Sequence, residues 1–482
     1  MPLRDHQVAP SAALAGIVDR YGSGVDFSIT GAGKTYVAAA AAGEYPTLVV
    51  HPKVAGSSWK RAAASLGKSF SQVGYEMLRT GGTPFGKWTN GAQRRKKFFK
   101  CQCCQRIVDM DRYFPCYVHP QGIHCLETKS EQHDYGDFVF HPAVKQVIFD
   151  EVHRCNGRDS LNADMLIAAK RQRIRVLGLS ATAGCSPLHF RALGYMLDLH
   201  GLDHDTVIPG RGVHPNFYRW ARKYGCRKDP RFRGLKWFAG REEQLEIMRE
   251  IREQIIPARG IRITEKDIPG FPECDIQSQL YDVDTPEEFN RLYAEVHEAL
   301  GVLTERQKDD LAPDSPLTRI LRARQRIELL KVPIATEVGQ DFLDKGFSLV
   351  LFVNFRQTID EMTKRFPEAR IIDGQTPGRD EAVDLFQDNT INTLIVNSAA
   401  GGGSLSMQDL TGFSPRVGLV MPNHSATSMQ QVFGRLPRDG GKSTAVYRVL
   451  LAEGTIEVNI HRALQTKLNN IEMLNDGDLS GL

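Results

Sequence analysis

Short runs of consecutive apolar residues, many of them β-branched, recur along the chain and alternate with stretches whose apolar residues stand at helical spacing. A run that is apolar at every position predicts a strand buried on both faces. Such strands separated by helices are typical of parallel sheets built from βαβ units. The predicted strands are 47–50, 147–149, 176–179, 349–353, 393–396 and 418–421. They form two groups, one before about residue 185 and one after about residue 345, so the pattern predicts an α/β protein with two lobes.

The stretch between the two groups has a different pattern. Apolar residues recur at helical spacing in 241–256, 285–304 and 317–344, and prolines separate these segments. An irregular stretch at 83–137 also interrupts the first lobe. We therefore predict lobe 1 at 1–210 with an insertion at 83–137, a basic and helical connecting region at 211–335, and lobe 2 at 336–482.

The composition narrows the class of protein. A chain of 482 residues exceeds what one ordinary core accommodates, and 41% hydrophobic with 24% charged residues is close to the average of folded globular proteins. The net charge of +4 neither requires nor excludes a nucleic-acid partner, because a basic face can be offset elsewhere. No apolar run approaches the roughly 18 residues of a membrane span, and Arg4 and Asp5 stand where a signal peptide would be apolar. We expect an intracellular, cytoplasmic protein without a membrane partner. Its oligomeric state is left open, and a monomer is compatible with the sequence.

The first lobe contains a glycine-rich loop, Ser28–Thr35, directly before an alanine-rich helical run. Glycines let the backbone curl so that successive N–H groups point at phosphate oxygens, and the following helix directs its positive end at the same anion. Lys34 would then reach the β- and γ-phosphates of ATP, and the Thr35 hydroxyl would bind Mg²⁺. The residues predicted to hold ATP here are Thr30, Gly31, Ala32, Gly33, Lys34 and Thr35. The alternative is a glycine-rich turn that merely precedes a helix.

Two adjacent carboxylates follow the predicted strand at 147–149. They would lie at the carboxyl edge of a parallel sheet, where ligands of α/β proteins bind. Asp150 can hold Mg²⁺ together with Thr35, and Glu151 can hold ATP and polarise the attacking water as a general base. A solvated strand end is the alternative, but the upstream loop and Ser180, just after another predicted strand, favour a nucleotide site.

The order of these elements resembles that of a known family, the superfamily 2 helicases. Their motifs I, II and III are similar to Gly33-Lys34-Thr35, Asp150-Glu151-Val152-His153 and Ser180-Ala181-Thr182, and the second of these resembles the DEAH-type box. The resemblance implies that both lobes are RecA-like and that ATP and Mg²⁺ bind between them.

Two further segments of the first lobe fit the same family. Arg4 and Gln7 lie in a segment similar to the upstream element whose glutamine reads the adenine base, so both are expected to bind the nucleotide. Residues 49–53, with Trp59 and Lys60, resemble motif Ia, which in the family contacts the nucleic-acid backbone.

The second lobe continues the resemblance. Residues 349–356 are similar to motif IV, residues 397–403 to motif V, and residues 431–438 fit motif VI completely. Arginines from the opposite lobe can neutralise charge that develops on the γ-phosphate, and they reach it only when the lobes close. The catalytic residues that the resemblance implies are Lys34, Glu151, Gln431, Arg435 and Arg438. A solvated basic helix is the alternative for the two arginines.

The wording of motifs V and VI favours one substrate. A Gly-Gly pair in motif V and the Gln-x-x-Gly-Arg of motif VI are similar to Swi/Snf-like and compact phage-type DNA helicases, although Ser404 and Ser406 depart from the Swi/Snf-like pattern. We therefore predict an ATP-dependent DNA helicase or translocase that acts on single-stranded, forked or branched DNA in replication, recombination or repair. An RNA helicase is an alternative. A nucleic-acid-binding scaffold with a weak ATPase is another, against which the intact motifs argue.

The insertion at 83–137 carries five of the nine cysteines, a clustering that favours metal binding over disulfides. Two ligand pairs separated by a loop can close a tetrahedral Zn²⁺ site, and thiolates and imidazole are the ligands that zinc prefers. The predicted ligands are Cys101, Cys104, Cys116 and His119, with Cys125 or His124 as candidates to replace one of the second pair. A surface loop of free cysteines is the alternative.

Three segments combine basic and aromatic residues: 93–100, 218–224 and 227–237. This composition suits a nucleic-acid backbone with exposed bases, and the alternative for each is a solvated face.

Overall fold

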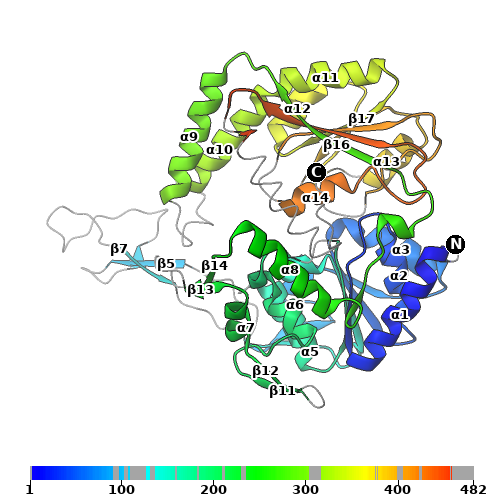
Figure 1. Cartoon of the computed structure of the whole chain (residues 1–482), viewed down its shortest axis with the longest axis vertical. Coiled ribbons are helices and arrows are strands. Elements are labelled where there is room, and N and C mark those ends of the chain that lie inside the picture. Colours follow the sequence, from blue (N-terminus) through cyan, green and yellow to red (C-terminus); the bar gives the residue numbers. More distant parts are fainter. Residues whose placement is uncertain are drawn as a thin grey trace.

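Two six-stranded sheets organise the protein, one in each half of the chain (Figure 1). The computed structural model describes residues 3–90, 97–101, 107–108, 126–130, 136–157, 160–181, 184–208, 212–228, 235–302, 316–374, 376, 378–398, 405–422, 426–455 and 457–458. The two α/β lobes with parallel sheets that the hydrophobic pattern predicts are confirmed.

The first sheet has the strand order β15-β1-β10-β9-β2-β3, and every pairing in it is parallel. Its strands are β1 (Ser23–Asp26), β2 (Thr47–His51), β3 (Ser71–Gly74), β9 (Gln146–Asp150), β10 (Arg175–Leu179) and β15 (Gly260–Ile261). The central strands are apolar because helices cover both faces: Val147, Ile148 and Phe149 are all fully buried. The carboxyl ends of β1, β9 and β10 consequently meet at one edge, which faces the second lobe.

The second sheet has the order β16-β21-β20-β17-β19-β18 and is also parallel throughout. Its strands are β16 (Cys274–Tyr281), β17 (Ser348–Val353), β18 (Arg370–Ile372), β19 (Thr393–Asn397), β20 (Arg416–Val420) and β21 (Ala445–Ala452). The chain runs from β17 towards β18 on one side and from β20 towards β21 on the other, so the strand order reverses between β17 and β20.

Helices cover the faces of both sheets. Those of the first half are α1 (Asp5–Tyr21), α2 (Lys34–Ala41), α3 (Gly56–Ser65), α4 (Tyr75–Arg79), α5 (Leu161–Arg171), α6 (Arg191–Met196), α7 (Phe217–Lys223) and α8 (Arg241–Ile255). Those of the second half are α9 (Pro286–Val302), α10 (Pro316–Leu330), α11 (Val332–Asp344), α12 (Arg356–Arg365), α13 (Arg379–Gln387) and α14 (Ala426–Phe433). In Figure 1, α14 lies where the two lobes meet, and α9 and α10 run side by side along the second lobe.

The connecting region contains the predicted helices, but it also supplies one edge strand to each sheet, β15 and β16. The hydrophobic pattern predicts neither strand. β15 has only two residues, and β16 pairs on one side only, so most of its side chains are exposed or half-buried and lack the continuous apolar run of a central strand. The predicted helical stretch 317–344 is divided into α10 and α11 at Lys331. Pro333 lies in the first turn of α11, where a proline is tolerated, whereas it would interrupt a continuous helix.

Smaller antiparallel pairs complete the fold. They are β4 (Gly86–Trp88) with β8 (Phe138–Phe140), β11 (Thr206–Ile208) with β12 (Gly212–His214), and β13 (Cys226–Lys228) with β14 (Leu235–Trp237). Within the predicted insertion, β5 (Lys97–Cys101) pairs with β6 (Ile107–Val108) and β7 (Leu126–Ser130).

Candidate active site

The glycine-rich loop connects β1 to α2, and two of its glycines have left-handed backbone conformations. Gly31 has a φ of 91° and Gly33 a φ of 84°, which glycine adopts without steric cost. A Cβ atom at Gly33 would lie 2.1 Å from Nε2 of Gln7, and this amide donates a hydrogen bond of 3.1 Å to the Ala32 carbonyl. The loop therefore curls, and Gln7 on α1 holds its backbone in place. The expected contact of Gln7 with adenine stays a prediction.

Lys34 begins α2 and turns its ammonium back towards the loop. Its Nζ donates to the carbonyls of Ser28 at 2.9 Å and Ile29 at 3.0 Å. Burial lowers the pKa of Lys34, against the attraction of three carboxylates, those of Glu151, Asp26 and Asp150. Asp26 ends β1 and was not singled out by the sequence. Burial raises its pKa, and its Oδ2 has no hydrogen-bond partner among the described residues.

Asp150 ends β9, and two aromatic side chains hold it from the side of α3 and α4. The indole Nε1 of Trp59 donates a 2.9 Å hydrogen bond to its Oδ2, and the Tyr75 hydroxyl donates to its backbone carbonyl at 2.9 Å. Burial, and then the neighbouring charge of Glu151, raise the pKa of Asp150 to about 6. The carboxylate is thus oriented by the Trp59 indole, and a hydrogen bond from the Glu151 backbone also lowers its pKa.

Glu151 and His153 follow Asp150 in a tight turn. Glu151 has a φ of 55°, a left-handed conformation that costs a non-glycine residue on the order of 1 kcal/mol. His153 Nδ1 lies 3.3 Å from Glu151 Oε2 and 2.9 Å from Ser180 Oγ. Burial alone would raise the pKa of Glu151, but the hydrogen bond from His153 and the charges around it hold this pKa below its usual value. Glu151 is therefore ionised at neutral pH, as a general base must be.

His153 also reaches the second lobe. Nε2 of Gln431, on α14, lies 3.4 Å from Nε2 of His153. One imidazole therefore joins the segments that follow β9 and β10 in the first lobe to α14 in the second.

The two arginines of motif VI, Arg435 and Arg438, also lie near Glu151. Arg435 is only 3% exposed, and burial lowers its pKa to about 10, against the attraction of Glu151. Arg438 donates from Nη1 to Ser406 Oγ at 3.0 Å and from Nε to the Gly434 carbonyl at 3.2 Å. Burial and the nearby Arg435 lower the pKa of Arg438 to about 9. Ser406, which departs from the Swi/Snf-like pattern, thus orients an arginine.

The lobes are in direct contact at this site. A Cβ atom at Gly434 would lie 1.9 Å from Thr30 Oγ1, and one at Gly31 would lie 2.9 Å from Arg438 Cγ. At the rim, Asp439 forms an ion pair with Arg4 and lies 3.7 Å from His6 Nε2. Glycine is thus required where motif VI approaches the glycine-rich loop.

The donor set fits a magnesium-bound triphosphate. Three cations, Lys34, Arg435 and Arg438, are gathered around the curled loop, and burial lowers the pKa of each. A polyanion would compensate these charges, and carboxylate and hydroxyl oxygens such as those of Asp150 and Thr35 are the ligands that Mg²⁺ prefers. Within the part of the chain that the structure describes, no group of three or more His, Cys, Asp or Glu side chains is arranged to hold a metal ion by itself.

No family model matches the chain. A protein of Acanthamoeba polyphaga mimivirus, named "Putative ATP-dependent RNA helicase L364", is 31% identical to it over 97% of this chain and 82% of that protein. The chain belongs to the superfamily 2 helicases. It is therefore an ATP-dependent helicase that acts on nucleic acid.

Solved structures align with the helicase along nearly its whole length but loosely. The Saccharomyces cerevisiae Dbp5 structure with RNA and ADP BeF3 has a TM-score of 0.44 and 11% identity, covering 97% of this chain and 92% of that one. The Hef helicase domain of Pyrococcus furiosus has a TM-score of 0.40 and 13% identity, covering 96% and 100%. The SWI2/SNF2 ATPase core of Sulfolobus solfataricus with double-stranded DNA has 0.35 and 13%, covering 96% and 91%. At these TM-scores no residue of the helicase is assigned a role by superposition.

The site brings together most of the residues that the sequence predicts for it. Trp59 differs from its prediction. Trp59, expected at the nucleic-acid surface with motif Ia, is fully buried against Asp150. Its position in an amphipathic helix, beside Ala62 and Ala63, was the available signal for burial. Thr182 and the glycines of motif V at 401–403 lie outside the described residues.

Most of the predicted zinc ligands also lie outside the residues that the structure describes. Cys104, Cys116, His119, His124 and Cys125 are outside the described residues, and only the backbone of Cys101, at the end of β5, is described.

The basic and aromatic segments of the helicase are only partly surface features. In 218–224, Trp220 and Tyr224 are buried at 3% and 2% exposure, so these rings pack into the core and offer no stacking surface. Tyr218, Arg222 and Lys236 remain accessible. The side chains of 93–100 are outside the described part of the chain.

Among the helices that the structure describes, none is long and apolar enough to cross a membrane.

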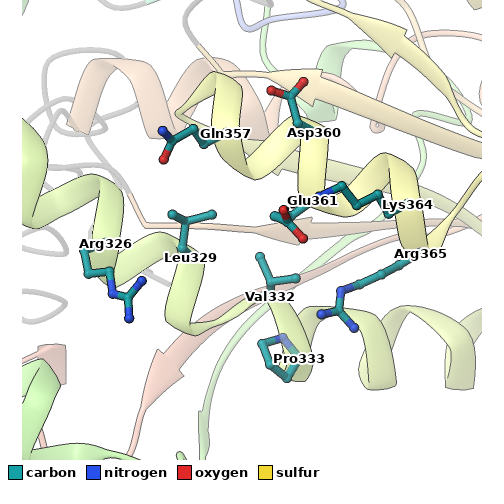
Figure 2. A pocket seen from close by; sticks show the side chains of 9 residues that line it. All are labelled: Arg326, Leu329, Val332, Pro333, Gln357, Asp360, Glu361, Lys364 and Arg365. Atoms are coloured by element: carbon teal, nitrogen blue, oxygen red, sulfur yellow. Dashed lines mark hydrogen bonds and ion pairs between the residues drawn. The ribbon is translucent and has the colours of Figure 1, made fainter.

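A depression of about 540 Å³ between α10, α11 and α12 is separate from this site. Most of its charged groups have partners: Asp360 pairs with Arg356 at 3.2 Å, Glu361 with Lys364 at 2.6 Å, and Arg326 with Glu288 at 3.2 Å. Figure 2 shows Asp360 and Arg365 pointing away from one another, so the lining groups do not converge on a ligand.

Proposed function

We propose that the protein is an ATP-dependent RNA helicase in which hydrolysis between the lobes drives movement along RNA or separation of its strands. The ATPase part rests on the contact of Gly434 and Arg438 with Thr30 and Gly31 across the lobes. The RNA part is supported by the mimivirus relative, which is named as an RNA helicase and matches 97% of the chain.

The residues of the site suit distinct roles in this reaction. Lys34 would bind the phosphates, and Thr35 and Asp150 would hold Mg²⁺, which when bound neutralises phosphate charge. Glu151, which its lowered pKa keeps ionised, would accept a proton from the attacking water. Arg435 and Arg438 would stabilise charge that develops on the γ-phosphate. Gln431, through His153, would link the arrival of these arginines to the segment that carries Glu151.

DNA translocation is the second candidate. It is favoured by the Gly-Gly pair of motif V and the Gln-x-x-Gly-Arg wording of motif VI, which are similar to DNA helicases. The nucleotide chemistry would be the same for both substrates, because the bases and sugars lie outside the ATP site.

The insertion is proposed to be a zinc-binding element. Cys101 ends β5 opposite Leu126 of β7, and Cys125 directly precedes Leu126 in the sequence. This register supports testing Cys125 alongside Cys116 and His119 as a ligand.

ATPase stimulation by defined nucleic acids tests the substrate. The purified chain is assayed with single-stranded RNA, duplex RNA, single-stranded DNA, duplex DNA and forked DNA of equal length and salt concentration. We expect RNA to give the largest increase in kcat, and an RNA duplex with a single-stranded tail to be separated only when ATP is hydrolysed.

The Glu151→Gln variant serves as the control, because it should bind RNA but separate no strands. Stimulation by DNA alone would replace RNA by DNA in the proposal. A turnover that no nucleic acid increases would contradict both and favour the scaffold hypothesis.

A further inference from the structure

A cavity of about 220 Å³ lies in the second lobe, away from the ATP site. It lies between α9 and α10 on one side and the segments that follow β17 and β20 on the other, and it is partly open to solvent. The strand order of the sheet reverses between these two strands, because β17 leads towards β18 and β20 leads towards β21. The carboxyl edge at such a reversal is where ligands of open α/β sheets bind.

Most charged groups that line the cavity are already compensated. Lys331 forms a buried ion pair with Glu457, which also accepts the Tyr293 hydroxyl at 2.5 Å and the Ala452 amide at 2.9 Å. These contacts use both oxygens of the Glu457 carboxylate.

Glu328 is compensated differently. Its carboxylate accepts the backbone amides of Asn354 at 2.9 Å and Phe355 at 3.1 Å, and the Asn354 side-chain amide at 2.7 Å. It therefore fixes the turn after β17 that forms one wall of the cavity.

Arg324 is the exception. Its side chain is half-buried and, among the described residues, its guanidinium makes no hydrogen bond or ion pair, and Nε is buried without a partner. Arg324 lies on the same face of α10 as Leu321 and Glu328, three and four residues away, and Lys331 follows directly after the helix. The cavity thus offers one cation with unused donors, and burying such donors without acceptors is costly.

The size and the remaining walls restrict the ligand. Small-molecule pockets usually measure roughly 300–1,000 Å³, so a cavity of about 220 Å³ suits one flat ring system better than a whole nucleotide. Tyr293 and Phe355 contribute aromatic rings, and Leu321 and Met421 contribute apolar surface. Unstacked RNA bases are bound in this way, between aromatic side chains and with hydrogen bonds to their edges.

We propose that this cavity captures one unstacked nucleobase of a bound RNA strand, with Arg324 donating to acceptors on the base edge. Guanine is the best match, because its O6 and N7 accept the paired donors of an arginine. The proposal rests on the proposed action on nucleic acid and adds a base contact to it.

Affinity measurements with and without bases test the cavity. The full chain is titrated with a fluorescent single-stranded RNA 12-mer rich in guanosine, with the same length of abasic ribose-phosphate chain, and with the DNA counterpart of the 12-mer. We expect Arg324→Gln to weaken binding of the guanosine-rich RNA about tenfold, as loss of one arginine–base contact does, and to leave abasic binding unchanged. Replacing guanosine by 7-deazaguanosine should reproduce part of the loss in the natural chain and add nothing in the variant.

Two further variants make the result specific. Arg322→Gln is the matched control, because Arg322 is exposed on the same helix and does not line the cavity, so it changes the charge equally. Leu321→Trp, at the partly exposed rim, should fill the cavity and weaken base-dependent binding while leaving the hydrogen bonds of Glu328 and Glu457 intact.

Equal losses for base-bearing and abasic strands in Arg324→Gln would identify a phosphate contact and overturn the proposal, as would unchanged affinity in both Arg324→Gln and Leu321→Trp. Base-dependent binding of the DNA strand alone, lost in Arg324→Gln, would support the cavity and contradict only the choice of RNA. A natural chain that binds none of the three strands would contradict the proposed function itself.

Discussion

Trp59 donates a 2.9 Å hydrogen bond from its indole nitrogen to Oδ2 of Asp150, across 91 positions of sequence. The indole is fully buried and packs edge-on against Phe70 at 6.1 Å between ring centroids, so it has little freedom to turn away. Trp59 stands on α3 and belongs, with residues 49–53, to the stretch that resembles motif Ia. Helix α3, which carries part of the expected nucleic-acid contact, is therefore hydrogen-bonded through Trp59 to Asp150, the carboxylate expected to hold Mg²⁺.

Trp59→Phe should lower kcat by about tenfold, because it removes one hydrogen bond to a charged group while keeping an aromatic ring in place. ATP affinity should change much less. Trp88→Phe is the matched control, since Trp88 is also buried and donates from Nε1 to a carbonyl, that of Arg79 at 3.0 Å, away from the site. Steady-state kinetics with both variants check this, and an equal loss in both would mean a general packing defect.

The raised pKa of Asp150, about 6, predicts a pH-dependent magnesium requirement. Above that pH the group is a carboxylate, the form that would bind Mg²⁺. As the pH falls through about 6, protonation competes and the half-saturating Mg²⁺ concentration should rise. The Trp59 hydrogen bond lowers this pKa, so Trp59→Phe should move the transition to higher pH. Magnesium titrations of ATPase rate between pH 5 and 8 measure it, and protonation of ATP affects both proteins alike. An identical pH transition in the two proteins would contradict the assignment.

Lys34→Ala and Glu151→Gln should both abolish ATP turnover by different routes. Lys34→Ala removes the positive charge that would bind the phosphates, so it should weaken nucleotide binding. The second keeps shape and hydrogen bonding but removes the base, so ATP should still bind. Equilibrium binding of a fluorescent ATP analogue separates the two defects, and normal hydrolysis in either variant would refute its assigned role.

Arg438→Ala should lower kcat by about 10²-fold or more, the scale of arginine-finger effects, with a smaller change in ATP affinity. Arg370→Ala, which removes an exposed arginine from β18 in the same lobe, is the control and should leave kcat near normal. A defect confined to ATP affinity would make Arg438 a binding residue and not a catalytic one.

The insertion should contain one zinc ion per chain, and Cys104→Ser should release it. ATPase activity without nucleic acid should largely survive, because the predicted ligands lie outside the ATP site. Elemental analysis of protein prepared without chelator gives the zinc content, and a content below roughly 0.2 per chain would leave only free thiols. Retention of zinc in His119→Ala and its loss in Cys125→Ala would identify Cys125 as the fourth ligand.

Local sequence alone determined the elements and the chemistry of the helicase. Continuous apolar runs specify strands buried on both faces, so β2, β9, β10, β17, β19 and β20 could be predicted from neighbouring residues. The glycines of the loop, the paired carboxylates and the arginines of motif VI are likewise recognisable, because a phosphate site needs those groups at fixed short spacings.

What the tertiary structure decided are relations between distant positions. His153 meets Gln431 across 278 residues, Gly434 meets Thr30, and β16 joins a sheet through one neighbour that follows it by more than 160 residues. The sequence placed Trp59 at the surface, whereas packing of α3 against the first sheet turned it towards Asp150. Hydrophobic periodicity reports which face of an element is buried, but not which other element covers that face. The partner is selected only when the layers pack together.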